Sequence, residues 1–222
     1  MNLTDQHVVV LGGTSGIGAA IADLAQQNGA RVTVASRRSS PSIDLTDPEG
    51  IETFFANLGP LDHLVVTANQ PVSGPLTDLT PERLATATDI KLFGALWAVR
   101  AAAPSLAPSG SITLFGGHFA QRPTAGSSLG ALVNGAIESL GRALAVELAP
   151  HRVNVIAPGI TDSPAWDRLG DNRPGFIAAQ AERLPLKRVA TPHDVAAATL
   201  ALLTNPAVTA TVSRVDGGAL VA

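Results

Sequence analysis

The chain has 222 residues and a net charge of −3, with 45% hydrophobic and 15% charged residues. This composition suits a single domain over residues 1–222 and excludes a disordered chain. The balance of charge, without a basic run, argues against nucleic-acid binding. The sequence contains no cysteine, which excludes disulfides and thiolate catalysis, and we expect no metal site.

Short apolar segments alternate with longer helical patterns along the chain. Apolar strands separated by helices are typical of a parallel sheet that is covered on both faces. The sequence therefore predicts a Rossmann-type, doubly wound α/β fold with three layers. Strands are expected at His7–Leu11, Arg31–Ala35, His63–Thr67, Ser111–Phe115, Val153–Ala157 and Val212–Val215, and helices at Gly16–Asn28, Pro48–Leu58, Pro81–Leu106, Ser127–Leu148 and Pro192–Leu203.

Two segments depart from this alternation. Residues 44–47 are expected to close a very short strand, and Asp47 to cap the helix that begins at Pro48. The segment Thr161–Pro185 is rich in proline, glycine and charge and follows a strand end. Since ligands of such sheets bind at the carboxyl ends of strands, we interpret it as a mobile lid, the alternative being a plain surface loop.

A glycine cluster follows the first strand and opens the first helix, reading VVVLGGTSGIG over residues 8–18. At a helix N-terminus the backbone N–H groups lack intrahelical partners, and the helix dipole favours negative charge. Glycines let the backbone turn tightly and approach a pyrophosphate. The position of the cluster between strand and helix therefore predicts a dinucleotide site.

The second strand ends in Ala-Ser-Arg-Arg, where a dinucleotide fold meets the adenosine ribose. An acidic residue there would bind the ribose hydroxyls, whereas arginine suits a 2′-phosphate. Arg37 and Arg38, with Ser15 and Ser36, therefore favour NADP(H) over NAD, the alternative being a solvated basic turn. Asp44 either accepts a hydrogen bond from the adenine amino group or caps a helix.

These motifs, with others along the chain, resemble the short-chain dehydrogenase/reductase family over essentially the whole sequence. The segment between Arg38 and Asp44 is shorter than is usual in that family, and the helix that normally follows the second strand is missing. The resemblance rests on Gly12-Gly13-Thr14-Ser15-Gly16-Ile17-Gly18, Asp44-Leu45-Thr46-Asp47, Asp62-His63-Leu64-Val65, Glu147-Leu148-Ala149-Pro150, Arg152-Val153-Asn154, Pro158-Gly159 and Val215-Asp216-Gly217-Gly218.

The resemblance implies a division of the cofactor site. The glycine motif would contact the pyrophosphate, Asp44 and Leu45 the adenine, and Pro158 to Thr161 the nicotinamide. Residues 66–69, Val-Thr-Ala-Asn, replace the family's Asn-Asn-Ala-Gly. The expected cofactor-binding residues are Gly12, Thr14, Ser15, Gly16, Ile17, Gly18, Ser36, Arg37, Arg38, Asp44, Leu45, Ala68, Asn69, Lys91, Pro158, Gly159, Ile160 and Thr161.

The family's usual catalytic side chains, an asparagine, a serine, a tyrosine and a lysine, have no counterparts here. By resemblance their positions fall at Lys91, Gly117, Gly130 and Asn134, and the chain contains no tyrosine at all. General acid–base catalysis by a positioned side chain contributes about 10²–10⁴-fold. Its loss argues against ordinary carbonyl reduction, but a substrate that is already cationic, such as an iminium, accepts hydride without being protonated.

Lys91, His118 and Asn134 are the candidate replacements. Lys91 would contact the ribose or donate to a substrate oxygen, and Asn134 would bind a ribose or a water. His118 is a proton donor or a structural histidine. Two further residues have open roles: Arg122 binds an anionic substrate or lies at the surface, and Asp162 is a cap or a base.

Three functions are compatible with these residues. The first is an atypical NADP(H)-dependent oxidoreductase of a small carbonyl or imine-type substrate. The others are a cofactor-binding regulator without redox activity, and an enzyme that catalyses a lyase or cyclisation step. No uninterrupted apolar stretch spans a bilayer and no signal peptide precedes the first strand, so we expect a cytoplasmic protein. Small residues on the helix at Ser127–Leu148 predict, by resemblance, a homodimer or homotetramer.

Overall fold

The structure, a computed structural model, describes residues 2–222. Its centre is a parallel sheet in the order β2-β1-β3-β4-β5-β6. The predicted doubly wound parallel sheet is therefore confirmed, although β4 begins earlier than expected. The strands are β1 (His7–Leu11), β2 (Arg31–Ala35), β3 (Leu61–Val66), β4 (Leu106–Phe115), β5 (Arg152–Pro158) and β6 (Val212–Val215).

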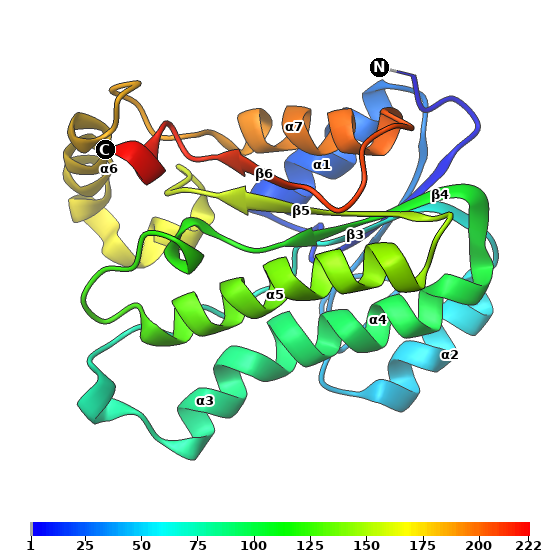
Figure 1. The fold of residues 1–222 in the computed structure, drawn as a ribbon, viewed down its shortest axis with the longest axis horizontal. Helices are drawn as coiled ribbons and strands as arrows, with labels where there is room; N and C mark the ends of the chain where they lie inside the picture. Colours follow the sequence, from blue (N-terminus) through cyan, green and yellow to red (C-terminus); the bar gives the residue numbers. More distant parts are fainter. Residues whose placement is uncertain (1) are drawn as a thin grey trace.

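Helices cover both faces of the sheet and complete the three layers (Figure 1). Helices α1 (Gly16–Gln27) and α7 (Pro192–Thr204) lie on one face, and α2 (Pro48–Leu58), α4 (Ala95–Ala102) and α5 (Ser128–Glu147) lie on the other. Because successive strand residues point to opposite faces, β1 feeds both cores. Val8 and Val10 pack in the core under α1 and α7, and Val9 and Leu11 pack in the core under α2, α4 and α5.

The topology places a crevice at the carboxyl end of β1. The chain passes from β1 to β2 on one side and returns to β3 on the other, and ligands of doubly wound sheets bind at such a reversal. The backbone N–H and the hydroxyl of Thr67 both donate to the carbonyl oxygen of Leu11, at 2.9 and 3.0 Å. These bonds fix the end of β3 against the end of β1.

The prediction of a very short strand closed by residues 44–47 is wrong. Only a single bridge pairs Ser36 with Ser42. The hydroxyl of Ser39 accepts from the Ser36 N–H at 2.7 Å and donates to the Pro41 carbonyl at 2.7 Å, so a tight turn uses groups that a longer strand would need. The expected cap is confirmed, because the Asp47 carboxylate accepts from the Gly50 N–H at 3.1 Å.

The single helix expected over Pro81–Leu106 is divided. It consists of α3 (Pro81–Thr88), a π-helical turn at Asp89–Gly94 and α4, followed by a 3₁₀ turn at Ala103–Ser105. A Cβ on Gly94 would lie 2.5 Å from the Leu45 carbonyl oxygen, so the turn lies close to the loop before α2 at this residue. Lys91 lies within this turn, and π-helical turns are frequent at functional sites.

The segment expected as a lid or plain loop is largely helical. It forms a 3₁₀ helix at Pro164–Asn172 and α6 (Arg173–Arg183). Asp162 is not a cap, because Ser163 holds that position and Asp162 accepts from Arg173 at 2.7 Å. The mobility of the segment stays a prediction.

Among residues 2–222, α5 is the one helix whose length and mean hydropathy, 1.2, would suffice to cross a membrane. Its buried face packs on β4 and β5 and includes Asn134 and Glu138. One third of this apolar helix is buried within the fold, and Leu132 and Val146 on it are exposed.

Candidate functional site

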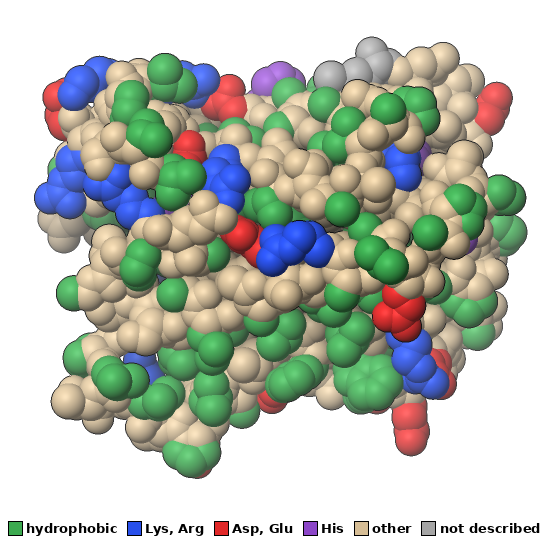
Figure 2. All heavy atoms as spheres, in the orientation of Figure 1, with side chains coloured by type: hydrophobic (Ala, Val, Ile, Leu, Met, Phe, Trp, Pro, Cys, Tyr) green, Lys and Arg blue, Asp and Glu red, His purple; other side chains and the backbone are tan. Residues whose placement is uncertain are grey.

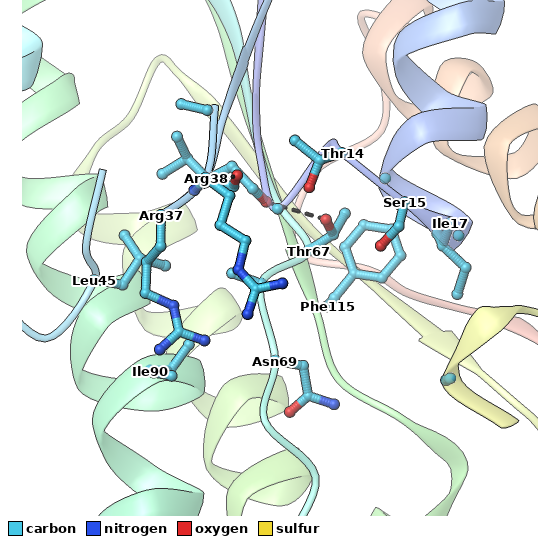
Figure 3. A pocket seen from close by; sticks show the side chains of 18 of the residues that line it. Thr14, Ser15, Ile17, Arg37, Arg38, Leu45, Thr67, Asn69, Ile90 and Phe115 are labelled. Carbon is cyan, nitrogen blue, oxygen red and sulfur yellow. Dashed lines mark hydrogen bonds between the residues drawn. The ribbon is translucent and has the colours of Figure 1, made fainter. Parts of the chain in front are cut away.

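A cavity of about 730 Å³ opens at the carboxyl ends of β1, β2 and β3 (Figure 3). It lies at the crevice that the topology creates. The structure brings most of the predicted cofactor residues together in its walls. These are Gly12, Thr14, Ser15, Gly16, Ile17, Gly18, Ser36, Arg37, Arg38, Asp44, Leu45, Ala68 and Asn69.

The glycine loop is packed too closely for side chains at two of its positions. Gly12 has a φ of +86°, and a Cβ there would lie 2.7 Å from the Ala68 nitrogen. A Cβ on Gly18 would lie 2.3 Å from the Gly12 carbonyl oxygen. Helix α1 begins at Gly16, and the side chain of its N-cap residue, Ser15, makes no capping bond. The unpaired N–H groups and the Ser15 hydroxyl therefore fit a pyrophosphate.

Arg37 and Arg38 extend into the cavity from the end of β2 (Figure 3). The turn that Ser39 stabilises holds them there. No ion pair of the described residues includes either arginine. Asp44 lies nearby, and hydrogen bonds from the backbone and hydroxyl of Thr46, followed by the charge of Arg37, lower the pKa of its carboxyl. The two free guanidinium groups fit a 2′-phosphate.

Sequence reasoning missed the apolar walls of the cavity. Ile90 reaches it from the π-helical turn, and Phe115 reaches it from the end of β4 (Figure 3). Neither residue has a polar group or a motif that would mark it as a ligand contact. The remaining unpredicted lining residues are Leu11, Ala35, Ile43, Thr67, Pro71, Ser163, Pro164, Ala165 and Arg168.

The predicted lid contributes its first turns to the same cavity. A Cβ on Gly16 would lie 3.7 Å from both Pro164 Cδ and Ser163 Cβ, so this segment lies against the start of α1. Arg168, from the same 3₁₀ helix, is also a lining residue. The proline and glycine content pointed to the segment, but nothing in the sequence singled out Arg168.

Residues 158–161, expected around the nicotinamide, do not line the cavity. The Gly159 N–H donates to the Val215 carbonyl at 3.0 Å, and a Cβ there would lie 2.8 Å from Asp216 Cα. The buried Thr161 hydroxyl donates to the Gly159 carbonyl at 3.2 Å. Ser163 and Pro164, which follow this segment, do line the cavity. The contact of residues 158–161 with a nicotinamide stays a prediction.

Two of the candidate catalytic residues, Lys91 and Asn134, are joined by a hydrogen bond between their side chains. The Lys91 Nζ donates to Asn134 Oδ1 at 2.6 Å and to the Gly116 carbonyl at 2.8 Å. No carboxylate of the described residues lies within ion-pair distance of this ammonium group. Burial without a counter-charge lowers the pKa of Lys91 to about 8. Lys91 directly follows Ile90, and the Gly116 whose carbonyl it binds directly follows Phe115. Ile90 and Phe115 line the cavity, whereas Lys91 and Asn134 do not.

Gly117 and Gly130, which stand at the family's serine and tyrosine positions, differ in what surrounds them. A Cβ on Gly117 would lie 2.7 Å from the Asn134 Nδ2, so the amide occupies the space that a side chain there would need. A Cβ on Gly130 would lie 3.2 Å from Phe119 Cδ2. The ring of Phe119 therefore fills space beside Gly130 that a larger side chain at that position would need.

His118 and Arg122 lie apart from the Lys91–Asn134 hydrogen bond and interact with other residues. Burial lowers the pKa of His118, opposed by the backbone of Pro158 and the charge of Asp216, and its ring lies 4.2 Å from that of Phe119. Arg122 donates to the Ala219 carbonyl at 2.5 Å, which ties the loop before α5 to the C-terminal turn. His118 is therefore not hydrogen-bonded to Lys91 or Asn134, and Arg122 is held by the backbone.

The fold and the cavity together define a dinucleotide-binding α/β protein, and comparisons with known proteins extend this assignment. Residues 12–219 match the family described as enoyl-(acyl carrier protein) reductase. The short-chain dehydrogenase/reductase malC of Malbranchea aurantiaca is 32% identical, covering 98% of this chain and 96% of that protein. The chain belongs to the short-chain dehydrogenase/reductase family.

Solved structures agree with this family assignment. A small-chain dehydrogenase in complex with NADPH has a TM-score of 0.93 and 37% identity, with 98% of this chain and 99% of that chain covered. A short-chain dehydrogenase of Burkholderia cenocepacia in complex with NADP has a TM-score of 0.89 and 28% identity, with 99% of each chain covered. The structure titled MalC reductase/Diels-Alderase has a TM-score of 0.92 and 28% identity, with 99% and 98% covered.

Proposed function

We propose that this protein is an NADP(H)-dependent oxidoreductase of a small organic carbonyl or imine-type substrate, with an active site that departs from the family pattern. The observation that carries the proposal is the cavity, which joins the glycine loop to the unpaired Arg37 and Arg38. The relatives that were solved with NADPH and NADP support the choice of cofactor. When bound, the cofactor supplies or accepts a hydride.

In this proposal the lysine and the asparagine of the family pattern have swapped positions, with Lys91 at the asparagine position and Asn134 at the lysine position. The ammonium stands on the helix that usually carries the amide, and the amide stands on α5, where the lysine is expected. Their 2.6 Å hydrogen bond supports a shared role, because each positions the other. Lys91 holds a proton that it donates to a substrate oxygen or, by the alternative, holds the ribose. An iminium substrate would dispense with that proton.

We expect Arg37→Ala and Arg38→Ala to weaken NADPH binding by about 10-fold or more each, and to leave NADH binding unchanged. The physical reason is that only NADPH carries the 2′-phosphate that these guanidinium groups fit. Calorimetric titration of both dinucleotides measures the effect. Arg31→Ala is the control, since Arg31 is exposed at the other end of β2. Equal affinity of the wild-type protein for NADPH and NADH would contradict the assignment.

A cyclisation or lyase activity is the second candidate, favoured by the structure titled MalC reductase/Diels-Alderase. The loss of nicotinamide absorbance with a broad panel of carbonyls and imines separates the two candidates. Bound NADPH that no member of the panel oxidises would refute hydride transfer. It would leave the non-redox functions, including a cofactor-binding regulator.

We propose further that the chain forms a homodimer or homotetramer. Large apolar side chains are exposed on α4 and α5, including Trp97 on α4 and Leu132 and Val146 on α5. Hydrophobic side chains gather over the lower half of the face seen in Figure 2, where these helices lie. Light scattering is expected to give a multiple of the chain mass, and Leu132→Glu a smaller mass. A wild-type mass of 22.6 kDa, that of one chain, would contradict the proposal.

A further inference from the structure

We propose that Arg168 is a further ligand of the bound dinucleotide, and that it holds the pyrophosphate from the lid side of the cavity. This inference rests on the proposed cofactor. It assigns to the lid segment a binding role that is separate from the 2′-phosphate contact of Arg37 and Arg38.

The first argument is the free charge of Arg168. Arg168 lines the cavity, is exposed and takes part in none of the ion pairs found within residues 2–222. Its neighbour Arg173, in contrast, is bonded to Asp162 and Asp167. The same short segment therefore pairs Asp162 and Asp167 with Arg173 and leaves Arg168 available to an anion.

The second argument is that Arg168 is held in place. Its guanidinium lies 5.6 Å from the centre of the Trp166 ring, a cation–π distance. Trp166 is fixed in turn, because its Nε1 donates to the Thr161 carbonyl at 3.0 Å and its ring packs against Phe176 at 4.7 Å. A ligand that meets Arg168 thus meets a partly positioned cation rather than a freely moving side chain.

The third argument is the place of the segment along the cavity. Ser163 and Pro164 lie against Gly16, where α1 begins, whereas Arg37 and Arg38 stand at the end of β2. The start of α1 is the pyrophosphate end of a dinucleotide site. A guanidinium fork matches the paired oxygens of a phosphate, and the lining residues contain three arginines but a single carboxylate, Asp44. Arg168 therefore adds a third cation to the site, at the end of the cavity where the pyrophosphate would lie.

The test uses the difference between the two dinucleotides. Both NADPH and NADH carry the pyrophosphate, so Arg168→Gln is expected to weaken both by the same factor, about 10-fold. Arg37→Ala and Arg38→Ala should instead weaken NADPH alone. Arg168→Lys, which keeps the charge but not the fork, should fall between the wild type and Arg168→Gln. Calorimetric titration measures the binding, and Arg183→Gln, an exposed α6 position outside the cavity, is the matched control.

Three outcomes would overturn the inference. Unchanged affinities in Arg168→Gln would mean that Arg168 does not meet the cofactor. A loss confined to NADPH would assign it to the 2′-phosphate instead. A wild-type protein that binds neither dinucleotide would refute the proposed function and the inference with it. Thermal unfolding of Arg168→Gln, expected to match the wild type, separates a binding loss from a folding defect.

Discussion

Lys91→Met is expected to lower the rate of substrate reduction by about 10²–10⁴-fold, the usual contribution of a positioned proton donor. Methionine keeps the length and most of the packing of the stem, so the change removes the ammonium with little change of shape. The rate is measured as NADPH oxidation with the best substrate of the panel, and the Kd for NADPH is measured separately. An effect on Kd alone would indicate the ribose contact rather than proton donation.

Lys187→Met is the natural control, because Lys187 is the only other lysine. It is exposed, and its Nζ donates to the Glu182 carbonyl at 2.7 Å, outside the cavity. Its activity should equal that of the wild type. If Lys91→Met also turned over and bound NADPH as the wild type does, Lys91 would have no part in the site.

The pH dependence of the same reaction follows from the burial of Lys91. Desolvation disfavours the ammonium and lowers the pKa of Lys91 to about 8, so the proton donor predominates below that pH and is lost above it. The reduction rate should be level at lower pH and fall as the pH rises through about 8. A fall that began only near 10.5, the ordinary value for lysine, would show that the reaction does not depend on this group.

The hydrogen bond between Lys91 and Asn134 can be tested by comparing two single variants with the double variant. Lys91→Asn alone removes the cation, and Asn134→Lys alone brings two ammonium groups together. The double variant restores one ammonium and one amide with their positions exchanged. If the two residues act as a unit, the double variant should lose less activity than the sum of the single losses. Additive losses would show that the 2.6 Å hydrogen bond has no functional consequence.

Arg152→Met is expected to destabilise the fold by about 3 kcal/mol, because it leaves buried carbonyl groups without donors. The Arg152 guanidinium donates to the carbonyls of Leu202, Val208 and Leu203, at 2.6, 3.2 and 2.7 Å. Two of these carbonyls belong to the last turn of α7, whose backbone has no further intrahelical donors. The charge also faces the negative end of the helix dipole.

Urea unfolding followed by circular dichroism measures this effect. Domains are stable by only about 5–15 kcal/mol, so the midpoint should move clearly to lower urea concentration. Arg142→Met, at an exposed position of α5, is the control and should change stability by less than about 0.5 kcal/mol. A loss in Arg152→Met as small as that of the control would show that water replaces the guanidinium.

Much of the fold could be predicted because its signals are local. The observed bounds of β1, β2 and β6 agree with the predicted ones, and Asp47 before Pro48 marks the start of α2. The division of Pro81–Leu106 could not be predicted in this way. Within the π-helical turn Gly94 lies close to the backbone of Leu45, which is distant in sequence.

The glycine loop and the arginine pair were predictable for the same reason, since a strand, a turn and a helix start are contiguous in the chain. Arg168 was not, because its role depends on the lid segment reaching Gly16 across the fold. The lid segment was interpreted as a mobile lid or a plain surface loop because it is rich in proline, glycine and charge. Proline is tolerated in the first turn of a helix, and both the 3₁₀ helix and α6 begin with one there.

The sequence by itself determined the kind of chain this is: a doubly wound sheet, a glycine loop, two arginines after β2, and no tyrosine to act as an acid or base. These are matters of composition and of neighbours along the chain. Only the tertiary structure decided that Lys91 meets Asn134 and that Phe119 adjoins Gly130. It also decided that Arg168 enters the cavity. Such contacts join residues far apart in sequence, and they depend on how the helices pack on the sheet rather than on local preference.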